Sequence, residues 1–324
     1  MQHNLLDLMI NRIPGLKAEE KIELVKNFDK EKDFSALSKN DIEKLLGRCL
    51  NKQSWNIAEI RKTAEKDAGL VNKLGMRLVS WRENVFPPLL REIFDPPVLL
   101  FYRGVLPDPE KPLAAVVGTR KPSPQAAVRA FALGKELGEL GIPLVSGLAL
   151  GIDSLAHRGN IEAGAPTVAV LGSSPDMVYP ASNRNLARRI LETGGAILSE
   201  YPPETRPMKW HYPARNRIIS GMARGTVIVE APEKSGALIT GRFALEQGRD
   251  LWVDSVSLAS AQGAGAARFA EDGAAVISSA KEILAEWKIS GKNSNSGKCG
   301  KEKAVQGNKA GLASSMAEYL DIEL

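Results

Sequence analysis

Six short apolar runs alternate with helix-length stretches between Leu113 and about Lys288, and this alternation restricts the fold more than any other feature of the chain. The runs are LAAVVG, IPLVSG, PTVAVLG, GAILSE, GTVIVEA and DLWVDSV. Continuous apolar runs of this length are typical of strands buried on both faces, and the intervals suit crossover helices. The pattern therefore predicts an α/β fold with a doubly wound parallel sheet, whose ligands bind at the carboxyl ends of the strands.

Four segments pass through a turn of Gly, Ser, Thr or Arg into a helical pattern, and they begin at Ala114, Ile142, His211 and Val227. A turn of small residues that opens a helix leaves backbone N–H groups and the positive end of the helix dipole facing outward. Arginines at two of these turns add forked donors that match phosphate oxygens. The sequence therefore predicts a phosphate-binding site.

Composition excludes several classes of protein. The chain has 324 residues, 44% of them hydrophobic, which suits two or three domains with packed cores. No apolar run approaches the ~20 residues of a membrane helix, and MQHNLLDLMINRI does not resemble a signal peptide, so we expect a cytoplasmic protein. Cys49 and Cys299 are too few for a disulfide framework, and three histidines give no metal-ligand cluster.

Positive charge is concentrated in one part of the chain. From Lys111 to Arg224 there are 14 basic and 8 acidic residues, whereas the formal charge of the whole chain is only +5. A local positive field attracts polyanions and makes their binding sensitive to salt. An ordinary solvated surface explains the same counts, so charge alone leaves both interpretations open.

Composition also divides the chain into four parts. Residues 1–76 predict several small amphipathic helices, with IPGL at Ile13 typical of a helix-hairpin-helix turn. Residues 77–112 are rich in Pro and aromatic residues, which excludes a regular helix and predicts an extended connector packed on the core. Residues 113–288 hold the six apolar runs. Residues 289–324 are rich in Gly, Ser, Asn and Lys and predict a flexible tail with a short amphipathic helix near its end.

Common nucleotide and catalytic motifs are missing from the sequence. The first apolar run ends in GTR instead of opening G-x-G-x-x-G, which disfavours NAD, and GKNSNSGKCG has the wrong spacing for an ATPase phosphate loop. Asp153 and His157 share a helix face, but Ser146 lacks the G-x-S-x-G setting of a nucleophile. A structural Asp–His pair is therefore favoured over a catalytic one, and we expect neither a cofactor nor a metal.

The segment PARNR offers the sharpest candidate side chains. Arg215 and Arg217 lie two apart around Asn216 and cannot share one helix face, so they suit a loop or helix start that offers donors to successive phosphates. The alternative is that these arginines satisfy local carbonyls or pair with Glu200 and Glu230.

The segment EKSGALITG has the pattern of a helix entry with free N–H groups, formed by Ser235, Gly236 and Thr240. A plain N-cap has the same pattern.

Five segments, in their order and spacing, resemble the bacterial DNA-processing protein A family. They are VVGTR, SGLALGIDSLAH, VAVLGSSPDMVYPASNRNLA, ILSEYPPETRPMKWHYPARNRIISG and VIVEAPEKSGALITGRFALEQGRD, and the resemblance covers about Arg77 to Leu284. It implies an extended Rossmann-like domain that binds single-stranded DNA without enzymatic activity. It also implies a homodimer that protects incoming DNA and passes it to a RecA-type recombinase, notably in natural transformation.

Carried over motif by motif, the resemblance implies a surface that binds the DNA backbone and leaves the bases largely unread. Its candidate residues are Arg120, Ser146, Gly147, Arg184, Arg215, Asn216, Arg217, Ser235 and Thr240. Trp210 and Tyr212, beside PARNR, are candidates for stacking on bases, although core packing explains them equally well.

Three departures from the family pattern limit this transfer. WVDSVSLASAQGAGAARF replaces the usual Val-Pro-Gly and Gly-x-Asn, so we expect an altered last strand and loop. Lys17 stands where the N-terminal hairpin commonly has a second Gly, which weakens a DNA-binding role for that hairpin. Many members carry a C-terminal winged-helix domain, where we expect only linker and a short helix.

A nucleotide-processing enzyme is the alternative function. Phosphoribohydrolases of similar layout carry Pro-Gly-Gly-x-Gly-Thr-x-x-Glu, whose Glu performs the chemistry. Here SGALITGRF stands in that place, with Phe243 three residues after Thr240, so the acid is absent. Glu230 lies upstream and serves only if the loop is arranged differently.

Overall fold

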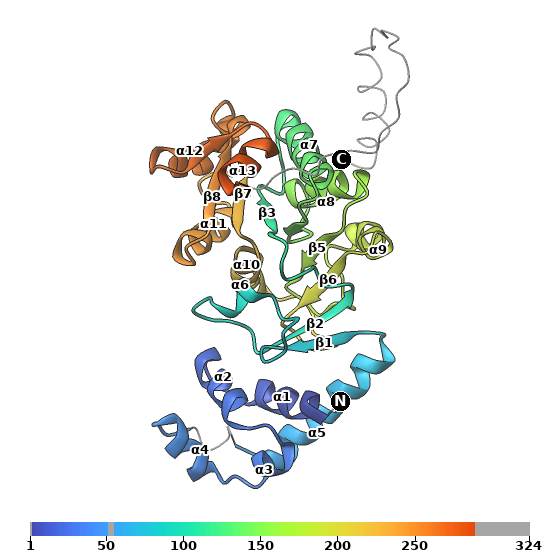
Figure 1. Ribbon diagram of the computed structural model, residues 1–324, viewed down its shortest axis with the longest axis vertical. Helices are drawn as coiled ribbons and strands as arrows, with labels where there is room; N and C mark the ends of the chain where they lie inside the picture. Colours follow the sequence, from blue (N-terminus) through green and yellow to red (C-terminus); the bar gives the residue numbers. More distant parts are fainter. Residues whose placement is uncertain (1, 51–54, 289–324) are drawn as a thin grey trace. The chain divides into compact units, whose positions relative to one another are not determined.

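A nine-stranded sheet in the order β1-β2-β6-β5-β4-β3-β7-β8-β9 organises the structure. The computed structural model describes residues 2–50 and 55–288 (Figure 1). The strands are β1 (Arg77–Ser80), β2 (Leu99–Gly104), β3 (Ala114–Val117), β4 (Leu144–Ser146), β5 (Thr167–Val170), β6 (Ala196–Ser199), β7 (Gly225–Ile228), β8 (Asp250–Asp254) and β9 (Ala275–Ile277). Strands β3 to β8 coincide with the six apolar runs and pair in parallel, which confirms the α/β prediction.

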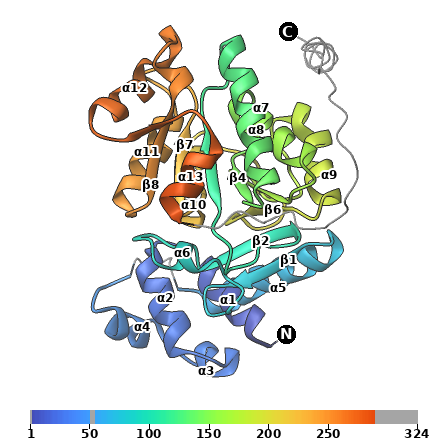
Figure 2. The same ribbon diagram turned by 45° about the horizontal axis from the view of Figure 1, so that its top comes forward.

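Helices cover both faces of the sheet, because successive residues of the central strands point to opposite faces and are apolar on both. One face packs against α7 (Pro124–Glu139), α8 (Ile152–Glu162), α9 (Arg184–Glu192) and α13 (Ala280–Trp287). The other packs against α6 (Pro88–Arg91), α10 (His211–Met222), α11 (Ala237–Glu246) and α12 (Ala264–Glu271) (Figure 2). In β3, Val116 belongs to the first core and Val117 to the second, as the two-residue period of a strand requires.

The chain reverses its direction of travel across the sheet at β3. It moves outward from β3 through β4, β5 and β6, and then returns to place β7 on the opposite side of β3. The loops after β3 and β7 therefore diverge, which opens a crevice at the carboxyl ends of these two strands. Crevices of this kind are where open α/β sheets bind ligands.

Five helices precede the sheet in the described part of the chain. They are α1 (Gln2–Arg12), α2 (Ala18–Asn27), α3 (Glu31–Ser35), α4 (Lys39–Leu46) and α5 (Ile57–Lys73). Their apolar faces form a core that also includes Leu99 and Phe101 of β2, and Arg82 donates to the buried carboxylate of Asp7 at 2.7 Å. These helices and the sheet belong to one compact unit, Met1–Gly291.

Residues 77–112 are more regular than the sequence pattern suggests. They contribute β1 and β2, which pair antiparallel with each other, and β2 continues the main sheet by pairing antiparallel with β6. The expectation that prolines exclude a regular helix here is wrong at α6, because Pro88 occupies the first turn, where no helical N–H is needed.

The segment that departs from the family pattern still forms β8, which pairs with β7 and β9 in parallel. The predicted tail, residues 289–324, lies outside the described residues. Among the helices that the structure describes, none combines the length and apolar character needed to span a membrane.

Candidate phosphate-binding site

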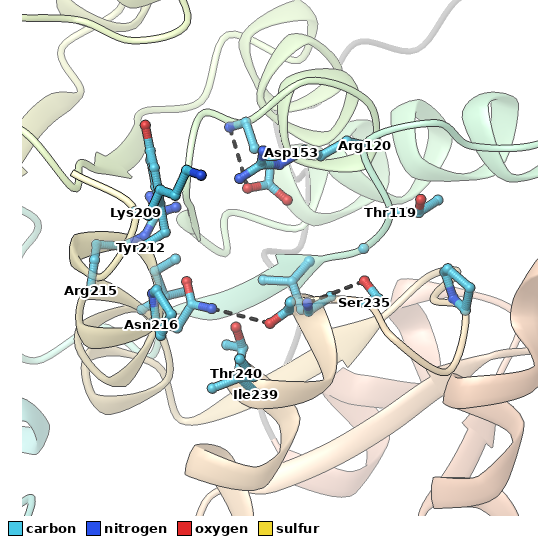
Figure 3. Close-up of a pocket in the computed structure, with 18 residues that line it drawn as sticks. Thr119, Arg120, Asp153, Lys209, Tyr212, Arg215, Asn216, Ser235, Ile239 and Thr240 are labelled. Carbon is cyan, nitrogen blue, oxygen red and sulfur yellow. Dashed lines mark hydrogen bonds between the residues drawn. The ribbon is translucent and has the colours of Figure 1, made fainter. Parts of the chain in front are cut away.

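An open pocket of about 490 Å³ lies at the crevice between β3 and β7. Its walls come from the loop after β3, the start of α8, the first turns of α10 and the start of α11. Figure 3 shows Thr119 and Arg120 on the β3 side, and Lys209 and Tyr212 on the α10 side. The sheet topology therefore places the turns singled out in the sequence around one hollow.

Two exposed cations stand at the mouth of the pocket. Arg120 follows β3, and its guanidinium carbon lies 5.5 Å from the centre of the Tyr212 ring. Lys209 precedes α10 and is also exposed. A cation held near an aromatic ring keeps its donors available to an incoming anion, because the ring attracts the charge without taking an N–H group.

Arg215 lies deeper and is 5% exposed. Its Nη1 donates to the carbonyl of Gly147 at 2.7 Å and to the carbonyl of Val170, while its buried Nε has no partner in the described structure. Burial lowers the pKa of Arg215 to about 10, with nearby Asp153 acting against that shift. Arg215 therefore remains a cation at neutral pH and contributes positive potential from the floor of the pocket.

Asp153 partly balances this charge at the start of α8. Its Oδ2 accepts from the backbone N–H groups of Gly147, at 3.1 Å, and Ala149, at 3.4 Å. Burial raises the pKa of Asp153, against the opposing effect of Arg215 and these amides. Asp153 thus fixes the loop after β4 and leaves the pocket rim cationic.

The start of α11 forms the opposite wall. Ser235 Oγ accepts from the N–H of Ala237 at 3.3 Å, and Asn216 Nδ2 donates to the carbonyl of Gly236 at 3.2 Å. Thr240 is buried and lines the pocket one turn further along the helix. The positive end of the α11 dipole therefore faces the same space as Arg120 and favours an anion there.

An aromatic slot adjoins the pocket. Tyr179, Tyr212 and Leu150 line it together with Arg120, and the two tyrosine rings lie 6.4 Å apart. Tyr179 is 53% exposed, and burial raises the pKa of Tyr212, which keeps its ring neutral. Trp210, 65% exposed, lies next to Lys209 in sequence. Exposed flat rings beside phosphate-binding cations suit unstacked bases.

Four of the residues predicted from sequence do not line this pocket. Ser146 is fully buried and donates to the carbonyl of Val116 at 2.6 Å. Gly147 lines the aromatic slot, but its N–H and carbonyl are engaged by Asp153 and Arg215. Arg184 is exposed at the start of α9, where it lines a separate hollow.

Arg217 is the fourth of these residues and has a structural position. Its Nη2 lies 2.7 Å from Glu200 Oε2, and its Nε lies 2.9 Å from Asp95 Oδ2. Burial works against the charge, but Glu200 and Asp95 together raise the pKa of Arg217. Pairing with Glu200 is the alternative that the sequence left open, and it removes Arg217 from the pocket.

The acidic and histidine candidates for catalysis are also engaged elsewhere. Glu230 is fully buried, and its two carboxylate oxygens accept from the N–H and hydroxyl of Ser123. His157 Nδ1 bonds to Thr167 Oγ1 at 2.8 Å, so its bond is with β5 and not with Asp153. Within residues 2–50 and 55–288, no group of His, Cys, Asp and Glu is arranged to hold a metal ion.

Sequence reasoning missed Lys209, Thr119 and Tyr179. Lys209 stands in the motif PMKWHYPARNR and Tyr179 in MVYPASN, so both lay within segments already singled out. Their placement depends on loops that close only when β5, β6 and α10 come together, which no local pattern predicts.

The chain resembles known proteins along most of its length. The sequence model of the family described as DNA recombination-mediator protein A matches residues 77–288. DNA processing protein DprA of Streptococcus pneumoniae is 40% identical over 207 residues, 64% of this chain and 73% of that protein. Protein Smf of Borreliella burgdorferi is 32% identical over 288 residues, 89% of this chain and 90% of that protein.

Two solved structures show the same similarity in three dimensions. The X-ray structure of DprA from Streptococcus pneumoniae matches with a TM-score of 0.72 and 34% identity, covering 88% of this chain and 98% of that chain. A structure that describes the single-stranded DNA binding mode of DNA processing protein A from Helicobacter pylori matches with a TM-score of 0.57 and 28% identity. It covers 66% of this chain and 95% of that chain.

Proposed function

The chain belongs to the DNA recombination-mediator protein A family, and on that basis we propose that it binds single-stranded DNA at the β3–β7 pocket without chemically changing it. The observation that carries the proposal is the convergence of Arg120, Lys209 and Arg215 with the start of α11 on one open hollow. Successive phosphates would meet donors from several elements at once. The related Helicobacter pylori protein, whose single-stranded DNA binding mode has been described, supports the choice of ligand.

The aromatic slot favours a single strand over a duplex. Bases within a duplex are stacked and paired, whereas those of a single strand are free to stack on protein rings. Tyr179 lines the slot, Trp210 follows Lys209 of the pocket in sequence, and both rings are more than half exposed. Stacking tolerates every base, so binding would depend little on sequence.

A wider role follows from the family. We propose that the chain acts in the cytoplasm as a homodimer that protects a bound strand and promotes loading of a RecA-type recombinase. Backbone contacts that leave bases accessible suit this role, because a recombinase must reach the same strand. Light scattering of the free protein measures whether it is a homodimer. The ATPase activity of the recombinase on DNA coated with this protein measures loading.

The alternative, a phosphoribohydrolase-like enzyme, needs a carboxylate presented to the pocket. Glu230 has both oxygens occupied by Ser123, and Phe243 stands where that family carries its acid. Asp153 is the carboxylate that does line the pocket, and two backbone amides hold it in place. Release of base or ribose phosphate from nucleotides that disappears in Asp153→Asn would favour the enzyme.

Fluorescence anisotropy with a labelled oligothymidylate tests the proposed DNA site. Arg120→Ala and Lys209→Ala should each weaken binding about tenfold and lower the salt slope by about 0.7, because each removes one phosphate contact. Lys281→Ala is the matched control, since Lys281 is exposed on α13 and lies outside the pocket. Equal affinity in all four proteins would refute the site.

A further inference from the structure

A second basic hollow lies on the other side of the loop that carries Tyr179. It measures about 240 Å³ and is lined by Arg103, Arg184 and Arg188 over an apolar floor that includes Val178 and Leu191. We call this hollow the α9 groove. Three guanidinium groups around one shallow groove are a typical footprint of a polyanion.

Strand β2, which the sequence pattern does not predict, forms one side of the α9 groove. Arg103 lies on β2 opposite Ile197 of β6, and Ile197 faces α9. Since β2 extends the sheet beyond β6, Arg103 lies on the same face of the sheet as Ile197 and lines the groove beside α9. Arg184 and Arg188 are one helical turn apart on that helix and complete the groove.

The acidic residues near the α9 groove leave its arginines available. Arg188 pairs with Glu192 at 3.6 Å, but both side chains are more than 60% exposed. Asp176 also lines the groove, and its Oδ1 accepts from the N–H of Glu204 at 3.4 Å. Exposed ion pairs of this kind contribute little, so a phosphate competes readily for Arg188.

The loop between the two hollows connects them. Val178 lines the α9 groove, whereas the next residue, Tyr179, lines the aromatic slot, which shares Arg120 and Tyr212 with the main pocket. Asn183 fixes this loop by donating to the carbonyl of Leu148 at 2.9 Å. Pocket, slot, Tyr179 and α9 groove therefore follow one another across a single surface.

We propose that the α9 groove is a second phosphate-binding subsite for the same DNA strand, which passes from the pocket over Tyr179 to Arg103 and Arg188. The inference rests on the proposed DNA-binding function and specifies the path of the strand. A short oligonucleotide occupies only the pocket, whereas a longer one reaches both subsites. The number of phosphates contacted therefore increases with strand length.

The test compares oligothymidylates of about 4 and 20 nucleotides in competition binding. The double variant Arg103→Ala/Arg188→Ala should bind the long strand about tenfold more weakly, with a salt slope smaller by about 1.4, and bind the short strand like the wild type. Tyr179→Ala should weaken only the long strand, and Tyr179→Phe should restore it. Arg189→Ala is the matched control, because Arg189 lies on α9 outside the groove.

The outcomes separate this inference from the proposed function. If Arg120→Ala weakens both strands while the double variant binds both like the wild type, the pocket stands and the α9 groove is wrong. Equal weakening of both strands by the double variant, with native circular dichroism, also contradicts a length-dependent subsite. If Arg120→Ala changes neither strand, the proposed pocket itself fails.

Discussion

At the scale of single residues, Arg215 and Arg217 show how far sequence reasoning reaches. Two residues apart, they cannot share one helix face, and the sequence favours a loop or helix start in which both offer donors to successive phosphates. In α10 they lie on different faces. Arg215 faces the pocket, whereas Arg217 pairs with Glu200 and Asp95. Which arginine takes which role depends on partners distant in sequence, since Asp95 precedes Arg217 by 122 positions.

His157 provides a residue-scale prediction about pH. Thr167 Oγ1 donates to the carbonyl of Leu144, so it accepts from the Nδ1–H of His157, which leaves Nε2 unprotonated and buried without a partner in the described structure. Burial, with the positive charge of Arg215, lowers the pKa of His157 to about 3. Between about pH 3 and 6.5, His157 is therefore protonated in the unfolded chain and unprotonated in the folded protein.

The stabilisation that neutral His157 gives the folded protein is complete above about pH 6.5. It decreases as the pH falls from about 6.5 to about 3. From pH 7 to pH 5 the loss is about 2 kcal/mol in the free energy of unfolding. His157→Asn keeps a donor for Thr167 and should be less sensitive to pH by that amount. Urea unfolding of both proteins at the two pH values measures the difference, and parallel pH dependence would exclude His157 as its source.

At the scale of elements, the sequence predicts the parallel strands well and the edge of the sheet poorly. Strands β3 to β8 are continuous apolar runs because both of their faces are buried. In β2, Arg103 and Gly104 are only half buried, and in β9 two of the three residues are exposed. Prolines beside β2 concealed it further, and its pairing with β6, almost 100 residues later, depends on tertiary contacts.

Close packing of α7 against α8 gives the prediction for elements. A Cβ added at Gly159 would lie 2.0 Å from the carbonyl oxygen of Phe131, a backbone atom that cannot move alone. Gly159→Ala should therefore lower the free energy of unfolding by about 3 kcal/mol. Gly69→Ala is the control, because a Cβ added at Gly69, within α5, would have no atom within 4 Å. This variant should raise the free energy of unfolding by about 0.5–1 kcal/mol. If both variants change the free energy of unfolding in urea equally, α7 and α8 separate easily enough to admit the added methyl group.

At the scale of the whole molecule, the N-terminal helices and the sheet share their structure through β1 and β2. Val98, Leu99 and Phe101 complete the core of the helices, while Leu100, between them, belongs to the core of the sheet. Composition divides the chain near residue 76, but it does not show that β1 and β2 contribute to the cores of both the helices and the sheet. The physical boundary therefore lies within a shared element.

Cooperative unfolding of the helices and the sheet follows from that sharing. Arg82 holds the fully buried carboxylate of Asp7 at 2.7 Å, so Arg82→Ala leaves a buried charge without its partner and should cost about 3 kcal/mol. Native-state hydrogen exchange should show the same decrease in the free energy of opening for amides of α1 and of β3, because both open only in global unfolding. Arg61→Ala is the control: it removes the ion pairs of the exposed Arg61 with Glu31 and Glu65, and it should change the exchange of α1 and β3 by no more than about 0.5 kcal/mol. Faster exchange in α1 with no change in β3 would mean that the helices unfold on their own.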